Sequence, residues 1–239
     1  MLTHQTRLAV ARIEYVMPFE PIMMMSDIGS FASPQDKCLQ SYNADMKSIE
    51  IDEIEKRQPS ARDGRSDKLL NPESKGTVII EREYATITYK RQLPHPREVV
   101  WRAITDPKEL AGWMNTKAVI DGRNDGTIDF VNSVSGFHTE GRILVWDPLL
   151  VFKHEWHIAP NSSLPGGEPE AIICWELEKA GGSDDTLLTL THSRLTRSTS
   201  GNFAPGWHAY LDRLEASLNN EKLPDWSQRF GAVKKLYPS

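Results

Sequence analysis

A histidine and an aspartate four residues apart, His208 and Asp212, are the first candidates for chemistry in this sequence of 239 residues. In a helix the two side chains lie on the same side, next to an apolar stripe that carries Trp207. A carboxylate in that position can orient an imidazole and raise its basicity, which is the arrangement of a general base. No motif places a serine or cysteine nucleophile beside them. We therefore favour the alternative, in which the pair forms a structural bond between helix and sheet.

Two further histidines lie in strand-like segments, where residues at alternate positions share one face. His154 shares a face with Phe152 and Trp156, and His192 shares one with Leu190. A neutral imidazole among such residues could hydrogen-bond a ligand or move a proton near neutral pH. We favour the alternative that both are core histidines bonded to neighbouring groups.

Two short patterns that suggest a metal or a nucleotide are discounted. The histidines of His154–His157 are three residues apart, whereas a zinc-binding HExxH helix needs four, and in a strand they point to opposite faces. The segment Leu164–Pro169 lacks the Lys-Ser/Thr end of a phosphate-binding loop. The sequence therefore predicts no metal site, no nucleotide site and no cofactor.

The elements that must position these residues start with residues 93–113, which read as two short helices in tandem. Pro96 suits the start of the first helix, because its missing N–H would be unbonded there anyway. Asp106 can cap the second helix, and Pro107 follows as its first residue. Leu110 and Trp113 then form the buried side of the second helix.

Strand-like segments surround this helix pair. Alternation and β-branched residues predict one long strand over residues 77–93 before the pair and six strands after it. An apolar stripe starting at Trp207 predicts a long helix over residues 205–219, and Asp225 can cap a further short helix. This order fits an α+β fold in which the long helix covers an antiparallel sheet. The later strands are predicted over residues 117–120, 126–132, 138–146, 149–158, 170–179 and 186–195.

Composition and charge narrow the functional classes. The net charge of −5 and the pI of about 5.8 leave no basic surface for nucleic acid or for an anionic membrane. No apolar run approaches the roughly 20 residues that span a bilayer, and the N-terminus lacks the apolar core of a signal peptide. The two cysteines, Cys38 and Cys174, lie far apart, which argues against a disulfide framework. We therefore expect a cytoplasmic protein without nucleic-acid or membrane partners.

The first 75 residues show no sustained helical or strand periodicity, and residues 58–75 are rich in Pro, Ser, Arg, Asp and Gly. Such a composition is typical of a disordered segment. We predict a disordered extension over residues 1–75, one folded domain over residues 76–220 and a C-terminal helical extension over residues 221–239. One hypothesis is that translation begins at Met25 or Met46, and the alternative is that the extension binds a partner.

Residues 93–113 also resemble the opening of the SRPBCC superfamily domain, in the branch named after the activator of the heat-shock-90 ATPase. The likeness continues through Glu140–Pro148, Thr189–His192 and Gly206–Leu214. It implies the helix-grip fold, in which a strongly curved antiparallel sheet wraps the last helix and leaves a cavity between them. In the first segment it is carried by Pro94, His95, Pro96, Val100, Trp101, Arg102, Ala103, Thr105, Asp106, Pro107, Leu110 and Trp113.

The cavity that this resemblance implies would be lined by the inward faces of the strands and of the last helix. Such cavities are mostly apolar with a few polar groups, which suits a small hydrophobic molecule. The residues that we expect to contact the ligand are Trp113, His154, Trp156, Trp175, His192, Trp207 and Leu211.

Three functional classes follow. We favour a protein that binds a small hydrophobic molecule. The second class is an enzyme of the cyclase or hydrolase kind found elsewhere in the superfamily, with His192 or the pair His208 and Asp212 as acid–base. The third is a module that interacts with a chaperone. Only the name of the branch implies this third class, and likeness of fold does not transfer function.

Overall fold

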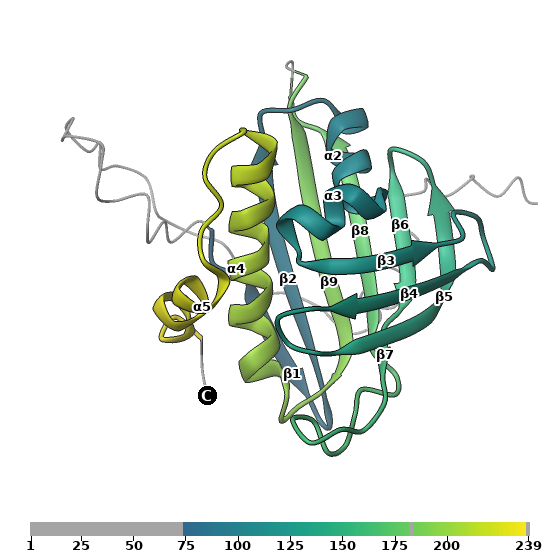
Figure 1. The fold of residues 1–239 in the computed structure, drawn as a ribbon, viewed down its shortest axis with the longest axis vertical. Coiled ribbons are helices and arrows are strands. Elements are labelled where there is room, and N and C mark those ends of the chain that lie inside the picture. Colours follow the sequence, from purple (N-terminus) through teal and green to yellow (C-terminus); the bar gives the residue numbers. More distant parts are fainter. Residues whose placement is uncertain (1–73, 182–183, 238–239) are drawn as a thin grey trace, which may run out of the picture. The chain divides into compact units, whose positions relative to one another are not determined.

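The structure is a computed structural model that describes residues 74–181 and 184–237 (Figure 1). The predicted disordered extension lies outside these residues except for Ser74 and Lys75, and so do the proposed start sites Met25 and Met46. The described residues form a curved antiparallel sheet, two short helices, the long helix α4 and a short C-terminal helix. This architecture confirms the predicted α+β class and the helix-grip arrangement.

The sheet has nine strands in the described part of the chain, and every pairing in it is antiparallel. Its order is β1-β2-β9-β8-β6-β5-β4-β3, and the short strand β7 pairs with β5. The strands are β1 (Thr77–Glu81), β2 (Tyr84–Leu93), β3 (Thr116–Ile120), β4 (Thr127–Asn132), β5 (His138–Asp147), β6 (Val151–Glu155), β7 (His157–Ile158), β8 (Ile172–Lys179) and β9 (Thr186–Thr196). The helices are α2 (Arg97–Thr105), α3 (Pro107–Trp113), α4 (Ser200–Leu218) and α5 (Trp226–Lys234).

The segment predicted as one long strand over residues 77–93 is a hairpin, so that prediction is wrong. Strands β1 and β2 pair from Thr77 opposite Thr88 to Glu81 opposite Tyr84. The chain reverses at Arg82, whose φ of 55° lies in the left-handed region. No Gly or Pro marks this turn, and apolar and polar residues alternate on both β1 and β2. The periodicity alone therefore does not distinguish this hairpin from one long strand.

The predicted helix pair is confirmed, and Asp106 separates its members. The Asp106 carboxylate accepts the backbone N–H groups of Lys108, at 2.8 Å, and of Glu109, at 3.3 Å. The buried indole of Trp113 donates to the carbonyl of Ala103 at 2.9 Å and so joins α3 to α2. A local cap therefore starts the second helix, and one long-range hydrogen bond fixes the angle between the two.

Strand β5 pairs with different neighbours along its two halves. It pairs with β4 and β7 along one part of its length and with β6 along another, where the register shifts between Ile143 and Val145. Gly141 allows the close approach of β6 here, because a Cβ atom on it would lie 2.3 Å from the carbonyl oxygen of Glu155. The predicted single strand over residues 149–158 is two strands, β6 and β7, separated by Trp156. The backbone N–H of Trp156 donates to the carbonyl of Ala171 at 2.7 Å.

Helix α4 begins at Ser200, five residues before the predicted start, and Pro205 lies inside it. The turn before it is fixed by the fully buried Glu168, whose carboxylate accepts from the backbone N–H of Thr196, at 2.9 Å, and from the hydroxyl of Thr199. Because Glu168 lies far back in the chain, no local signal announces this start. Trp207, Leu211 and Leu214 of the predicted apolar stripe are buried, and Leu218, at its end, is half-buried.

The C-terminal half of α4 is joined to its neighbours by the buried guanidinium of Arg213. Its Nε donates to the carbonyl of Trp113 at 2.6 Å, its Nη2 to that of Gly112 at 3.3 Å, and its Nη1 to that of Pro224 at 2.5 Å. One side chain therefore links α4, the end of α3 and the segment that leads into α5. As predicted, Asp225 caps α5, by accepting the backbone N–H of Gln228.

Two observations concern the expected cellular compartment. Cys174 is buried on β8. The expected absence of a disulfide framework and the cytoplasmic location both stay predictions. Among the described helices, none is both long enough and apolar enough to cross a membrane.

Replacing Asp106 with alanine should lower the free energy of unfolding by about 1 kcal/mol, because the first turn of α3 loses its acceptor. The matched variant Asp106→Asn keeps a side-chain oxygen in place and should lose far less. Urea unfolding followed by tryptophan fluorescence measures both. An equal loss in the two variants would contradict a role for the carboxylate oxygen as a helix cap.

Candidate functional site

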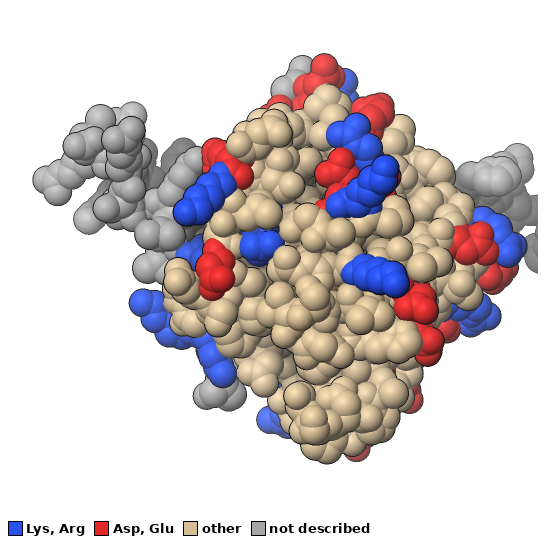
Figure 2. All heavy atoms as spheres, viewed as in Figure 1, with Lys and Arg blue, Asp and Glu red and all other residues tan. Residues whose placement is uncertain are grey.

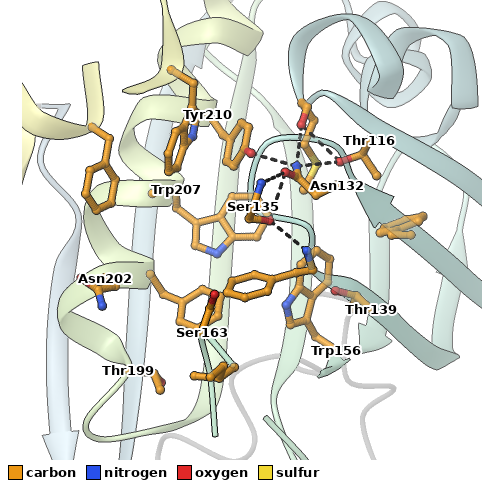
Figure 3. A pocket seen from close by; sticks show the side chains of 18 of the residues that line it. Thr116, Asn132, Ser135, Thr139, Trp156, Ser163, Thr199, Asn202, Trp207 and Tyr210 are labelled. Carbon is orange, nitrogen blue, oxygen red and sulfur yellow. Dashed lines mark hydrogen bonds between the residues drawn. The ribbon is translucent and has the colours of Figure 1, made fainter. Parts of the chain in front are cut away.

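A pocket of about 400 Å³ lies between α4, α5 and the strands β3, β4 and β5 (Figure 3). This volume lies in the range of small-molecule sites, roughly 300–1,000 Å³. Eight aromatic side chains line it, together with eight hydroxyl or amide side chains and with Met114, Leu164 and Gly206. The aromatic residues are Phe130, Phe137, Trp156, Phe203, Trp207, Tyr210, Trp226 and Phe230. The polar residues are Thr116, Asn132, Ser135, Thr139, Ser163, Ser198, Thr199 and Asn202.

The aromatic rings of the wall pack against one another. Trp156 lies between Phe130 and Trp207, with ring centroids 5.9 and 5.8 Å away. Phe137 and Phe203 stack at 6.4 Å across the pocket from the β4–β5 turn to α4. None of the described lining residues is Asp, Glu, Lys, Arg or His. On the face shown in Figure 2, charged side chains lie along the edges and across the upper and central parts, and the lower middle is uncharged.

Asn132 organises the polar side of the pocket. Its Nδ2 donates to the hydroxyl of Tyr210 at 2.8 Å and to the carbonyl of Met114 at 2.9 Å, while its Oδ1 accepts the backbone N–H of Ser135 at 2.9 Å (Figure 3). Because the Tyr210 oxygen accepts in this bond, its hydrogen remains available for another partner. Burial raises the pKa of Tyr210, so the phenol stays protonated and can donate to a ligand.

His192 lies behind Trp207 and does not line the pocket. The indole N–H of Trp207 donates to its Nδ1 at 2.9 Å, which places the proton of the neutral ring on Nε2. That Nε2 has no hydrogen-bond partner among the described residues. Burial, followed by the nearby His154, lowers the pKa of His192 to about 3. The ring is therefore neutral at physiological pH and is used to hold Trp207.

His154 is a second buried imidazole in the core, as the alternation on its strand predicts. Its Nδ1 lies 2.8 Å from the carbonyl oxygen of Glu155 and donates to it. Its ring packs against Phe152, Trp156 and Phe130, with centroids 4.6, 5.8 and 6.0 Å away. Burial lowers the pKa of His154 to about 4, so this ring is also neutral.

His208 and Asp212 belong to a buried polar network outside the pocket. Nδ1 of His208 lies 2.8 Å from the hydroxyl of Tyr237, and its Nε2 lies 3.6 Å from Oδ2 of Asp212. Asp212 also accepts from Nε of Arg229 at 2.5 Å and pairs with Nη2 of Arg91 at 3.7 Å. Burial lowers the pKa of His208 to about 4 against the opposing pull of Asp212. The pair therefore joins α4 to β2, α5 and the C-terminus.

Two of the seven residues predicted to contact a ligand, Trp156 and Trp207, line the pocket. The other five lie in the buried layer behind it, and their role stays a prediction; they are Trp113, His154, Trp175, His192 and Leu211. Sequence reasoning missed the contributions of the β4–β5 turn, the first turn of α4, and α5. The spacing of Trp226 and Phe230, four residues apart on one helical side, was the local signal for the last of these.

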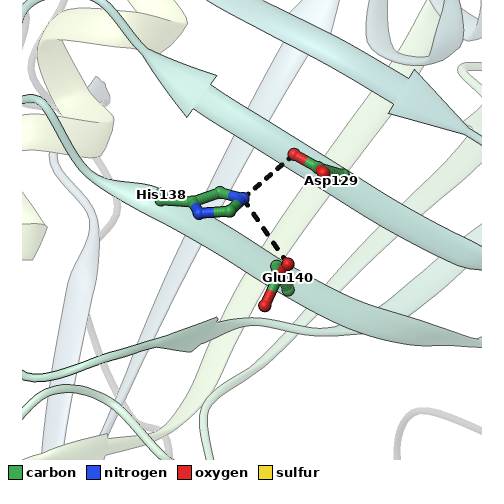
Figure 4. A group of neighbouring side chains, drawn as sticks. All are labelled: Asp129, His138 and Glu140. Atoms are coloured by element: carbon green, nitrogen blue, oxygen red, sulfur yellow. Dashed lines mark hydrogen bonds and ion pairs between the residues drawn. The ribbon is translucent and has the colours of Figure 1, made fainter.

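A small cluster on the outer face of the sheet has metal-ligand chemistry (Figure 4). The ligand atoms of Asp129, His138 and Glu140 all lie within 4.8 Å of one another. Nε2 of His138 lies 3.1 Å from Asp129 and 3.6 Å from Glu140, and all three side chains are more than half exposed. The register places Asp129 directly opposite Glu140, and the imidazole of His138, two residues before Glu140 on the same strand, lies near both carboxylates. The expected absence of a metal stays a prediction.

Acid should destabilise the protein through its buried histidines. The pKa values of His154 and His192, about 4 and about 3, lie below the ordinary value of 6.5, so only the unfolded chain binds protons as the pH falls below 6.5. The free energy of unfolding is therefore unaffected by these groups above pH 6.5 and decreases progressively toward pH 4. Near pH 5 the decrease is about 2 kcal/mol per histidine.

The variant His154→Asn tests this dependence, because the amide nitrogen of Asn takes the place of Nδ1 and can still donate to the Glu155 carbonyl but does not titrate. Its free energy of unfolding should fall less steeply with decreasing pH than that of the wild type. The difference in slope should correspond to about one proton fewer taken up on unfolding. Urea unfolding at several pH values between roughly 4.5 and 7 gives both slopes. Identical slopes would contradict a neutral, buried His154.

Comparison with known proteins adds evolutionary context. None of the curated proteins matches this sequence. Among solved structures, CalU16 from Micromonospora echinospora is 22% identical over 68% of this chain and 92% of its own, with a TM-score of 0.51. The protein encoded by BPP1335 from Bordetella parapertussis is 23% identical over 64% of this chain and 84% of its own, with a TM-score of 0.52. At such identities the likeness shows the fold alone.

The family comparison is more specific. The family described as "Activator of Hsp90 ATPase homolog 1-like protein" matches residues 94–219, which is more than half of the chain and runs from the start of the helix pair through α4. This match confirms the resemblance seen in residues 93–113. The chain belongs to the Activator of Hsp90 ATPase homolog 1-like protein family, within the SRPBCC superfamily.

Proposed function

We propose that this protein binds a small, uncharged and largely apolar molecule in the pocket between α4 and the sheet. The observation that carries the proposal is the aromatic wall of a pocket of about 400 Å³ whose described lining residues bear no charge. Burying apolar ligand surface there would contribute about 25 cal/mol per Å². Family membership supports a binding domain of this kind.

The polar groups of the pocket would orient the ligand. The Tyr210 hydroxyl, held by Asn132, has a hydrogen free to donate to a ligand oxygen. A charged ligand would lose its hydration without gaining a partner, which costs several kcal/mol. The site therefore favours neutral molecules that present an apolar body and a hydrogen-bond acceptor.

The enzyme alternative is less well supported by the geometry. His192, His208 and Asp212 do not line the pocket, and each already has a partner in the scaffold. The chaperone alternative rests on the name of the family. Adding the protein to the Hsp90 ATPase and measuring the rate tests that alternative directly.

A matched pair of fluorescent probes tests the proposed function. N-phenylnaphthylamine and anilinonaphthalene sulfonate share one aromatic skeleton, and only the second carries a negative charge. The neutral probe should bind with a brighter emission and a Kd at least about tenfold lower, because no cation lines the pocket to pair with the sulfonate. Failure of the neutral probe to bind, or equal affinity for the two, would contradict the proposed selectivity.

A large side chain at Gly206 should fill the pocket and weaken this binding. Gly206 lies on α4 at the pocket wall, and a Cβ atom on it would meet only Trp226, at 3.9 Å. In Gly206→Phe the added ring would occupy the pocket and raise the Kd of N-phenylnaphthylamine at least about tenfold.

Gly206→Ala is the control for the pocket-filling variant. It adds one methyl group at ordinary contact distance and should keep the binding, while alanine stabilises the helix by about 1 kcal/mol. Fluorescence titration gives the Kd values, and thermal unfolding shows that both variants fold. Unchanged binding in a folded Gly206→Phe variant would place the probe elsewhere.

A further inference from the structure

We propose that α5 forms the outer wall of the pocket and sets the size of ligand that the pocket accepts. The inference rests on the proposed function, since it concerns the same site. Helix α5, Trp226–Lys234, lies beyond residues 94–219, the part of the chain that the family matches. This wall is therefore built by a segment outside the shared domain.

Two aromatic side chains of α5 build the wall. Trp226 and Phe230 lie four residues apart on one side of the helix, stacked with centroids 5.0 Å apart and planes 24° apart. Both line the pocket, and the Trp226 ring also lies 5.4 Å from that of Tyr210 on α4. The two rings therefore continue the aromatic surface of α4 outward.

The rest of α5 is held in place by contacts that do not involve these two rings. Nε of Arg229 donates to Asp212 of α4 at 2.5 Å, and Val233 is fully buried. The segment before the helix is fixed by the bond from Arg213 to the carbonyl of Pro224. Shortening Trp226 or Phe230 should therefore change the wall and leave the helix attached.

The position of these rings explains why they would select by size. Both side chains are half-buried, with the pocket on one side and solvent on the other. Truncating either ring extends the pocket toward solvent. A small ligand would lose an aromatic contact, whereas a larger one would gain the room that the ring had filled.

Two neutral probes of different size test this inference, the smaller N-phenylnaphthylamine and the larger Nile red. In Trp226→Ala and in Phe230→Ala the Kd of the smaller probe should rise about tenfold, while that of Nile red stays constant or falls. The control Gln228→Ala, at an exposed position of the same helix, should change neither value. Thermal unfolding of every variant monitors the fold.

The outcomes separate the two proposals. If the wild type binds neither probe, the proposed function fails and this inference fails with it. A second outcome is that the wild type binds the probes and the two alanine variants bind them with unchanged affinity, or that both probes lose affinity by the same factor. In that case the pocket binds ligands but α5 does not select them by size. Should Trp226→Ala not fold, Phe230→Ala and Trp226→Leu decide, and both should shift the ratio of the two Kd values in favour of Nile red.

Discussion

The hydrogen bond from the indole of Trp207 to Nδ1 of His192 joins the long helix to the interior of the sheet. With water excluded from both residues, losing one partner would leave the other unsatisfied, at a cost of about 1–3 kcal/mol. The bond exists only while the imidazole is neutral, which its burial ensures. Trp207 also forms part of the pocket wall, so the contact that holds α4 in place shapes the cavity as well.

Helix α4 keeps its apolar and its ionic contacts apart. Trp207 and Tyr210 face the pocket, whereas His208 and Asp212 face β2, α5 and Tyr237. The buried carboxylate of Asp212 is compensated there by arginines, as a buried charge requires. Because Asp212 pairs with Arg91 of β2 and Arg229 of α5, this charge does not enter the pocket. An aromatic pocket beside a buried ionic network is possible only because one helix separates the two.

The sequence allowed correct predictions wherever a few neighbouring residues determine the structure. Asp106 and Asp225 cap helices through bonds two or three residues away, and strand alternation placed His154 and His192 inside. The predictions were wrong where contacts between residues far apart in the sequence determine the structure. The turn at Arg82 has no local signal, and the start of α4 depends on Glu168 across a loop. The pocket lining joins residues from β3 to α5, and such a set emerges only once the strands are paired.

Arg213 gives the two ends of α4 a different response to acid. Its guanidinium donates to backbone carbonyls of α3 and of the segment before α5, and these acceptors do not titrate. The attachment through His192 depends on a ring that protonation would charge. As the solution becomes more acidic, α4 should therefore separate from the sheet at its N-terminal half, while its C-terminal half stays tethered. The helix would open like a hinge, with Arg213 near the axis.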